Sequence, residues 1–201
     1  MTTTVERSTV APTRLVVLAA VYLVLLVWAV LWKLEPPWVG EAGWRIVKLV
    51  PFVATDHAGA STRFDVVANL ALFVPFGVYL GLLAPSWRCR RVAGTLAAAS
   101  LALEVAQYVL AVGSSDLTDV VVNTAGGLLG LGLLAVARRR LRDRTTAVVT
   151  RACAIGTALA LLAGALVVVS PVRFGPPEDV RCTPGMPCGP PRAPRDAVLT
   201  F

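Results

Sequence analysis

Long apolar runs separated by short polar stretches dominate this chain. The runs cover residues 15–34, 66–84, 92–112, 120–137 and 147–170. Each run is long enough for one span, because a helix needs about 20 mostly apolar residues to cross a hydrocarbon core about 30 Å thick. The pattern therefore predicts an all-α fold, a polytopic bundle of about five transmembrane helices.

The first run has an alternative interpretation as a secretory signal peptide, because Arg7 and Arg14 precede it. The run is longer than the usual signal-peptide core, and no Ala-x-Ala cleavage site follows it. We therefore favour a retained membrane anchor.

Composition supports a membrane protein, since 56% of the 201 residues are hydrophobic and only 15% are charged. The formal net charge of +7 raises the alternative of nucleic-acid binding. The basic residues, however, lie between the apolar runs, as topology signals do. We therefore expect no nucleic-acid partner.

Loop charge predicts the orientation of the bundle. Arg residues are concentrated at 88–91 and 138–144, whereas the connection at 113–119 holds two Asp and no basic residue. Cytoplasmic loops carry the excess of Lys and Arg. The N-terminus is therefore predicted inside and the C-terminus outside. The inner segments are then 1–14 and 138–146, and the outer ones are 35–65 and 171–201.

The outer loop at 35–65 includes a pattern typical of an amphipathic helix lying on the membrane. Glu41, Arg45 and Lys48 share one face, and Trp38 and Trp44 are placed to sit among headgroups. An ordinary packed loop is the alternative.

The tail at 171–201 is rich in Pro and Arg and is predicted to be mostly irregular. Cys182 and Cys188 flank a turn-forming Thr-Pro-Gly-Met-Pro stretch in an oxidising compartment. A local disulfide is favoured over zinc binding, because two sulfurs without a nearby His do not complete a tetrahedral site. We expect no metal and no cofactor.

Polar side chains inside the second, third and fourth runs are the candidate functional residues. Such groups are costly when they face lipid, and they normally face a protein interior or a water-filled cavity. With the predicted orientation, all of them fall in the outer half of the bilayer. The alternative is that they only cap helices or join neighbouring helices by hydrogen bonds. The six residues are Asp65, Asn69, Glu104, Gln107, Asp119 and Asn123.

Pro and Gly residues predict how two of these helices pack. Pro75, followed by Gly77, predicts a bend in the second helix and a free backbone acceptor at Ala71. Gly126 and Gly130 allow the fourth helix to approach a neighbour closely.

The polar and glycine positions together resemble the VanZ-like family of bacterial membrane proteins. The motif runs Asp65-x3-Asn69-x3-Phe73-x-Pro75-x-Gly77, then Glu104-x2-Gln107, then Asp119-x3-Asn123-x2-Gly126-x3-Gly130. The resemblance covers about residues 60–135. It implies a multi-pass protein of the bacterial plasma membrane, in a family named for a component linked to teicoplanin resistance. It implies no known reaction.

One position departs from the family pattern. Members commonly place an Arg near the position of Gly113, where this chain reads Gly-Ser-Ser-Asp. If that Arg partners an intramembrane carboxylate elsewhere in the family, Glu104 lacks it here, and Arg63 is a candidate replacement.

Three functions are compatible with these residues. The first is a non-enzymatic envelope protein that binds a lipid-linked or amphiphilic ligand, such as a cell-wall precursor, at an outer-leaflet polar site among membrane lipids. The second is a membrane enzyme acting on a lipid headgroup or cell-wall precursor, with Glu104 as acid or base. The third is a small proton-coupled carrier. We favour the first, because the chain lacks a Ser-His pair and a His-Glu-x-x-His motif.

Overall fold

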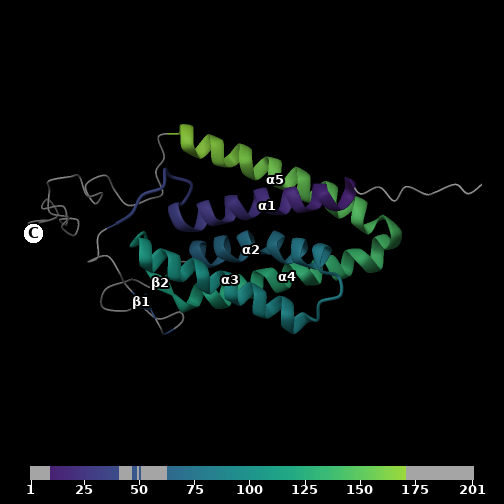
Figure 1. The fold of residues 1–201 in the computed structure, drawn as a ribbon, viewed down its shortest axis with the longest axis horizontal. Helices are drawn as coiled ribbons and strands as arrows, with labels where there is room; N and C mark the ends of the chain where they lie inside the picture. The colour runs from purple at the N-terminus through teal and green to yellow at the C-terminus, as the bar shows by residue number, and fades with distance from the viewer. Residues whose placement is uncertain (1–9, 41–46, 49, 51–62, 171–201) are drawn as a thin grey trace, which may run out of the picture.

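The computed structural model describes residues 10–40, 47–48, 50 and 63–170. Five long helices account for most of these residues (Figure 1). They are α1 (Val10–Trp32), α2 (Arg63–Leu83), α3 (Cys89–Leu110), α4 (Leu117–Leu141) and α5 (Thr145–Val169). The predicted all-α fold is confirmed. Cys182 and Cys188 lie outside the described residues.

Four helical stretches of the described chain are long and apolar enough to cross a membrane, and the last of them, Leu117–Val169, is 53 residues long. This last stretch contains both α4 and α5, because only a 3₁₀ turn, η2 (Arg142–Arg144), separates them. The chain reverses direction at this turn (Figure 1). Each of these two helices has 25 residues, or about 37 Å at 1.5 Å per residue. Either one therefore exceeds the thickness of a bilayer core.

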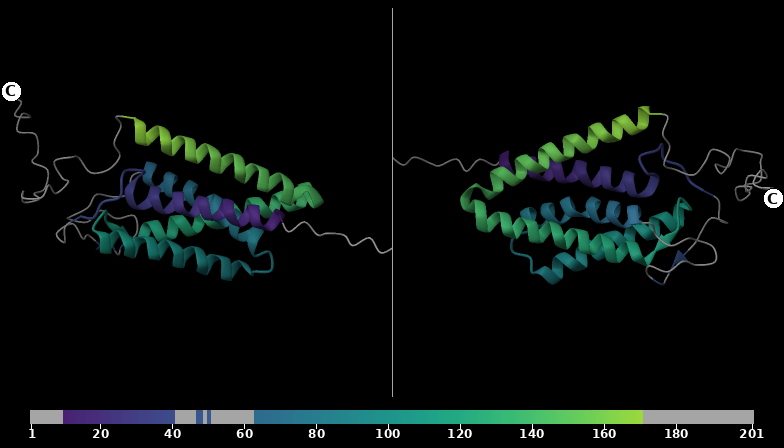
Figure 2. Two further views of the ribbon diagram at one scale, coloured as in Figure 1. Left: turned by 45° about the horizontal axis from the view of Figure 1, so that its top comes forward. Right: turned by 180° about the vertical axis from the view of Figure 1, so that it is seen from behind.

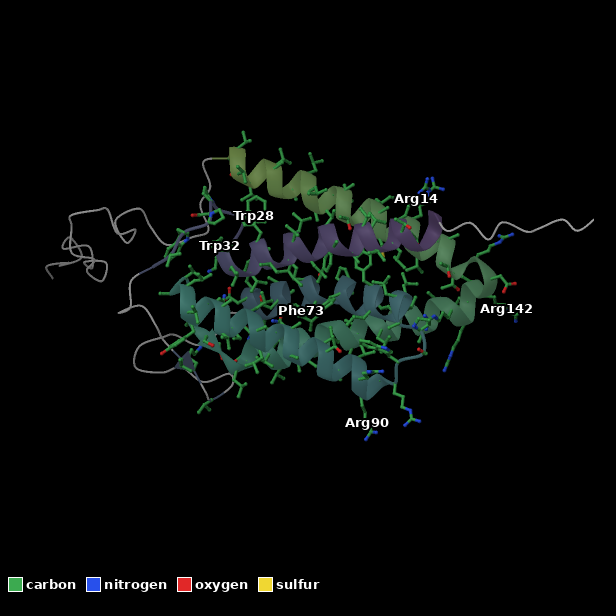
Figure 3. The ribbon with its side chains drawn as sticks, viewed as in Figure 1. Arg14, Trp28, Trp32, Phe73, Arg90 and Arg142 are labelled. Carbon is green, nitrogen blue, oxygen red and sulfur yellow. The ribbon has the colours of Figure 1, made fainter. Side chains whose placement is uncertain are left out.

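The bundle has two chemically different ends (Figure 3). Trp28 and Trp32 lie near the end at which α1 and α3 finish and α2 and α4 begin; we call this the Trp end. Arg14, Arg90 and Arg142 lie toward the opposite end, which we call the Arg end. The structure therefore separates the basic loops from the polar intramembrane residues.

The closest helix pair is α2 and α4, which pack through backbone. A side-chain carbon added at Gly126 or Gly130 would overlap the carbonyl oxygen of Leu70 or Val74, respectively. One added at Gly77 would overlap the carbonyl of Gly127. Small residues permit this approach, which brings the polar starts of α2 and α4 together.

Helix α1 packs against α2 and also contacts α3, and α5 lies against α1 (Figure 2). The Tyr22 hydroxyl donates a hydrogen bond to the Leu72 carbonyl, one residue from the acceptor that Pro75 was predicted to free. Phe73 is fully buried and meets Phe76 edge to face, with ring centroids 5.9 Å apart. Helix α1 therefore contacts α2 in the turn that precedes Pro75.

The loop between α1 and α2, predicted to lie outside, contributes a strand where the sequence predicted a helical face. β1 (Val47–Lys48) pairs in parallel with β2 (Ser115–Asp116), with Lys48 opposite Asp116. Glu41, Arg45 and Trp44 of the predicted interfacial helix lie outside the described residues.

Candidate functional site

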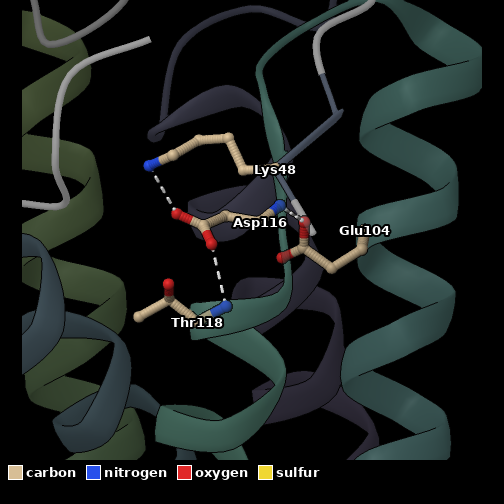
Figure 4. Close-up of polar contacts among 4 residues, drawn as sticks. All are labelled: Lys48, Glu104, Asp116 and Thr118. Atoms are coloured by element: carbon tan, nitrogen blue, oxygen red, sulfur yellow. Dashed lines mark hydrogen bonds and ion pairs between the residues drawn. The ribbon is translucent and has the colours of Figure 1, made fainter. Parts of the chain in front are cut away.

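A buried polar cluster closes the Trp end of the bundle (Figure 4). The Asp116 backbone N–H donates to Glu104 Oε2 over 2.7 Å. Asp116 Oδ2 pairs with Lys48 Nζ at 2.8 Å, and Asp116 Oδ1 accepts the Thr118 backbone N–H, also at 2.8 Å. Each of the four residues is at most 4% exposed. Asp116 therefore connects α3, β1 and α4 through three separate groups.

Local chemistry explains why Asp116 occupies this position. It is the N-cap of α4, with extended backbone angles, and its carboxylate satisfies one of the amides that a helix start leaves without a partner. A negative group is also stabilised at a helix N-terminus. The cap is therefore Asp116, whereas the sequence suggested Asp119 as a candidate.

The loop between α1 and α2 is held against the bundle before residue 41 as well as at β1. The indole N–H groups of Trp28 and Trp32 donate to the carbonyls of Glu35 and Trp38, at 2.7 and 2.9 Å. The Gly40 N–H donates to Leu110 at 2.9 Å. These bonds use side chains and backbone of α1 and α3, so the loop covers the Trp end at fixed points.

A second, more accessible group of polar residues lies beside the buried cluster. Asn69 on α2 interacts through its side chain with the carboxyl group of Asp119 on α4. Asp119 is also close enough to interact electrostatically with Asp65 and Glu104. Asp65 is exposed, and Asn69 and Asp119 are partly exposed. We call Asp65, Asn69 and Asp119 the acidic site.

The acidic site and the buried cluster together carry an excess of negative charge. Four carboxyl groups, those of Asp65, Glu104, Asp116 and Asp119, lie in this region, and the buried cation among them is Lys48. The Lys48 charge is already paired with Asp116 at 2.8 Å. A ligand with an amine or several hydrogen-bond donors therefore complements the acidic site better than an anion does.

The remaining two predicted residues point elsewhere. Asn123 Nδ2 donates to Ser100 Oγ at 2.9 Å, joining α4 to α3 below the acidic site. Gln107 Nε2 donates to the Val30 carbonyl of α1 at 3.1 Å. The side-chain oxygens of Asn123 and Gln107 are buried without a partner in the described part of the chain. The structure thus brings together Asp65, Asn69, Glu104 and Asp119, but separates Asn123 and Gln107 from them.

The two positions flagged by the family pattern have distinct surroundings. An added Cβ at Gly113 would lie 3.7 Å from Gln107 Nε2, so a larger residue there would first meet Gln107. Arg63 is exposed at the start of α2, and the described structure records no ion pair between it and Glu104. Glu104 instead accepts the Asp116 amide N–H and interacts with the Ser115 side chain.

Lys48 and Asp116 are the site residues that the sequence interpretation did not select. Asp116-x-Thr118 at a helix start is a capping signal and could have identified Asp116. Lys48 had no comparable signal, because its partner is 68 residues away along the chain. Only the path of the outer loop brings the two together.

Ser100→Ala should lower the free energy of unfolding by about 1 kcal/mol, since interhelical hydrogen bonds in membranes contribute about 0.6 and at most about 1.7 kcal/mol. Unfolding in mixed detergent micelles measures the change. Thr124→Ala is the matched control, because the Thr124 hydroxyl bonds to Val120 within its own helix. Equal effects for both variants would contradict an interhelical role for Ser100.

Comparison with known proteins identifies the family of this chain. The family model described as VanZ/LLP1 matches residues 19–138, which include the buried cluster and the acidic site. This chain belongs to the VanZ/LLP1 family. Protein VanZ of Enterococcus faecium is 32% identical over 129 residues, covering 63% of this chain and 77% of that protein. No solved structure matches.

Family membership and the long apolar helices together make this a VanZ-like membrane protein. The family resemblance predicted from the sequence is confirmed. The matched region ends at the last turn of α4, so α5 and the tail lie beyond it.

Proposed function

We propose that this VanZ-family protein binds a lipid-linked or amphiphilic ligand at the acidic site, in the outer leaflet of the bacterial plasma membrane. Binding there would alter how cell-surface material meets glycopeptide antibiotics such as teicoplanin. One observation carries the proposal. Asp65 is exposed, and Asn69 and Asp119 are partly exposed, beside the buried, hydrogen-bonded cluster around Asp116. Carboxylates that face a membrane are costly and are typically functional.

The neighbours of the acidic site support an amphiphilic ligand. Phe64, the residue before Asp65 on α2, is 74% exposed. A headgroup at the carboxylates would therefore have apolar surface beside it for its hydrocarbon part.

The outer-leaflet location rests on charge. The arginines of the α2–α3 loop and of η2 lie toward the Arg end, away from the acidic site (Figure 3). Because positive loops remain in the cytoplasm, the Trp end is expected to face outward.

Expression in a glycopeptide-susceptible bacterium tests the proposal. The wild-type protein should raise the minimal inhibitory concentration of teicoplanin. Asp65→Asn and Asp119→Asn should each return it toward the vector-only value, because each removes a charge from the binding surface. Immunoblots of membrane fractions check that the variants remain as abundant as the wild type.

Asp143→Asn is the matched control, since this exposed carboxylate lies in η2 at the Arg end. It should keep the wild-type effect. If both acidic-site variants raise the minimal inhibitory concentration as much as the wild type does, the assignment of ligand binding to the acidic site is wrong. No effect of the wild-type protein on susceptibility would show that the function is wrong.

Glu104→Gln separates binding from the enzyme and carrier hypotheses. Gln keeps a side-chain oxygen that can accept the Asp116 N–H, so the fold should be preserved. A positioning role predicts that this variant retains its effect on susceptibility. Loss of the effect at normal abundance would favour a reaction or proton transfer that uses the Glu104 carboxyl group.

A further inference from the structure

A small basic hollow lies at the opposite end of the bundle from the acidic site. It measures about 260 Å³ and lies at the connection of α2 to α3 and the first turn of α3; its lining residues are Ser86, Trp87, Arg88, Arg90 and Arg91. Its volume is just below the range of about 300–1,000 Å³ in which drug-sized ligands bind. The hollow is therefore suited to a small charged group.

The guanidinium groups around the hollow are available to an anion. Arg88, Arg90 and Arg91 are exposed, and the described residues provide no carboxylate within ion-pair distance of them. The Arg91 guanidinium lies 4.9 Å from the centre of the Trp87 ring, a cation–π contact that orients it. Three cations therefore lie within four residues at the start of α3.

The backbone adds to this charge. The hollow lies at the N-terminus of α3, where Arg88 is the N-cap and no side chain caps the helix. The first turn of α3 has no acidic residue. An anion at this place would interact with both the arginines and the positive end of the helix.

The position favours a lipid over a free anion. The loop joins the ends of two long apolar helices, so it lies at the depth of the lipid headgroups. Leu83, the last residue of α2, is 42% exposed beside it and offers apolar surface for an acyl chain. Partly buried Trp87 is a residue type enriched at this depth.

We propose that this loop binds the phosphate headgroup of an anionic phospholipid in the leaflet at the Arg end. The three arginines would contact the phosphate, with Trp87 holding Arg91 in place. This site is separate from the acidic site, so either can fail without affecting the other.

Native mass spectrometry of the full-length, delipidated protein in detergent tests the proposal. The probes are dioleoylphosphatidylglycerol and dioleoylphosphatidylcholine, which share acyl chains but differ in net charge. The wild-type protein should retain phosphatidylglycerol preferentially. Arg88→Gln/Arg90→Gln/Arg91→Gln should weaken this binding at least about tenfold, because each basic residue near an anionic lipid surface contributes about fivefold.

Arg139→Gln/Arg140→Gln/Arg142→Gln is the matched control, since it removes the same charge from the other basic loop. It should keep phosphatidylglycerol binding within about threefold of the wild type. If the triple loop variant does not fold, Arg90→Gln alone should weaken binding about fivefold.

Three outcomes would overturn the proposal. The two triple variants could lose phosphatidylglycerol equally, which would indicate a general positive surface. Phosphatidylcholine could bind as tightly as phosphatidylglycerol. Inorganic phosphate at millimolar concentration could bind and displace the lipid, which would indicate a site for the free anion.

Discussion

Gly130→Ala is expected to lower the free energy of unfolding by about 3 kcal/mol, at the upper end of the usual cost of overpacking. The added methyl group would overlap the Val74 carbonyl oxygen, which belongs to the backbone of α2 and cannot rotate away. The two helices would have to separate where Gly126 also contacts Leu70. Unfolding in mixed detergent micelles and the yield of folded protein in membranes would both report the loss.

Gly132→Ala provides the control on the same helix. A side-chain carbon at Gly132 would have no heavy atom within 4 Å. Because Ala forms helix more readily than Gly, this variant should be neutral or more stable by up to about 1 kcal/mol. Similar destabilisation by both substitutions would contradict the close α2–α4 packing.

Lys48→Met should lower the free energy of unfolding by about 3–5 kcal/mol, because removing one partner leaves the other buried charge uncompensated. The side chains of Lys48 and Asp116 are only 3% and 5% exposed, so water cannot replace the lost contact. The loop that carries β1 would also lose its connection to the cap of α4. The same micelle unfolding experiment measures this change.

The double variant Lys48→Met/Asp116→Asn should recover a substantial part of that stability. Asn can still accept the Thr118 N–H, and no buried charge remains in the pair. Lys33→Met is the matched control, since Lys33 is exposed and should change stability by less than about 0.5 kcal/mol. If the effects of Lys48→Met and Asp116→Asn on the free energy of unfolding simply add in the double variant, Lys48 and Asp116 are not a coupled pair.

The proposed division of roles within the polar residues came from burial. The sequence placed Glu104 among the six candidate residues, since a carboxylate deep in an apolar helix needs a partner or a function. In the structure, Glu104 is 2% exposed and accepts the Asp116 backbone N–H. We therefore treat it as a positioning residue and assign ligand contact to Asp65, Asn69 and Asp119.

The sequence by itself determined the helices and the family. Apolar runs predicted five helices whose ends lie a few residues from those observed. The prediction succeeds because a helix satisfies its backbone hydrogen bonds locally, and because a membrane helix can be apolar on every face. The motif from Asp65 to Gly130 predicted VanZ/LLP1 membership, which the family match confirmed. Alternating helix direction also predicted that the polar starts of α2 and α4 lie at the same end as Glu104.

Only the tertiary structure decided which polar groups touch. Asn123 and Gln107 have a helical spacing compatible with the acidic site, yet they bond to Ser100 on α3 and to Val30 on α1. The rotation of each helix against its neighbours determines this choice, and spacing along one helix does not encode it. The Lys48–Asp116 pair depends in addition on an irregular loop with no periodic pattern, so a contact across 68 residues left no trace in the sequence.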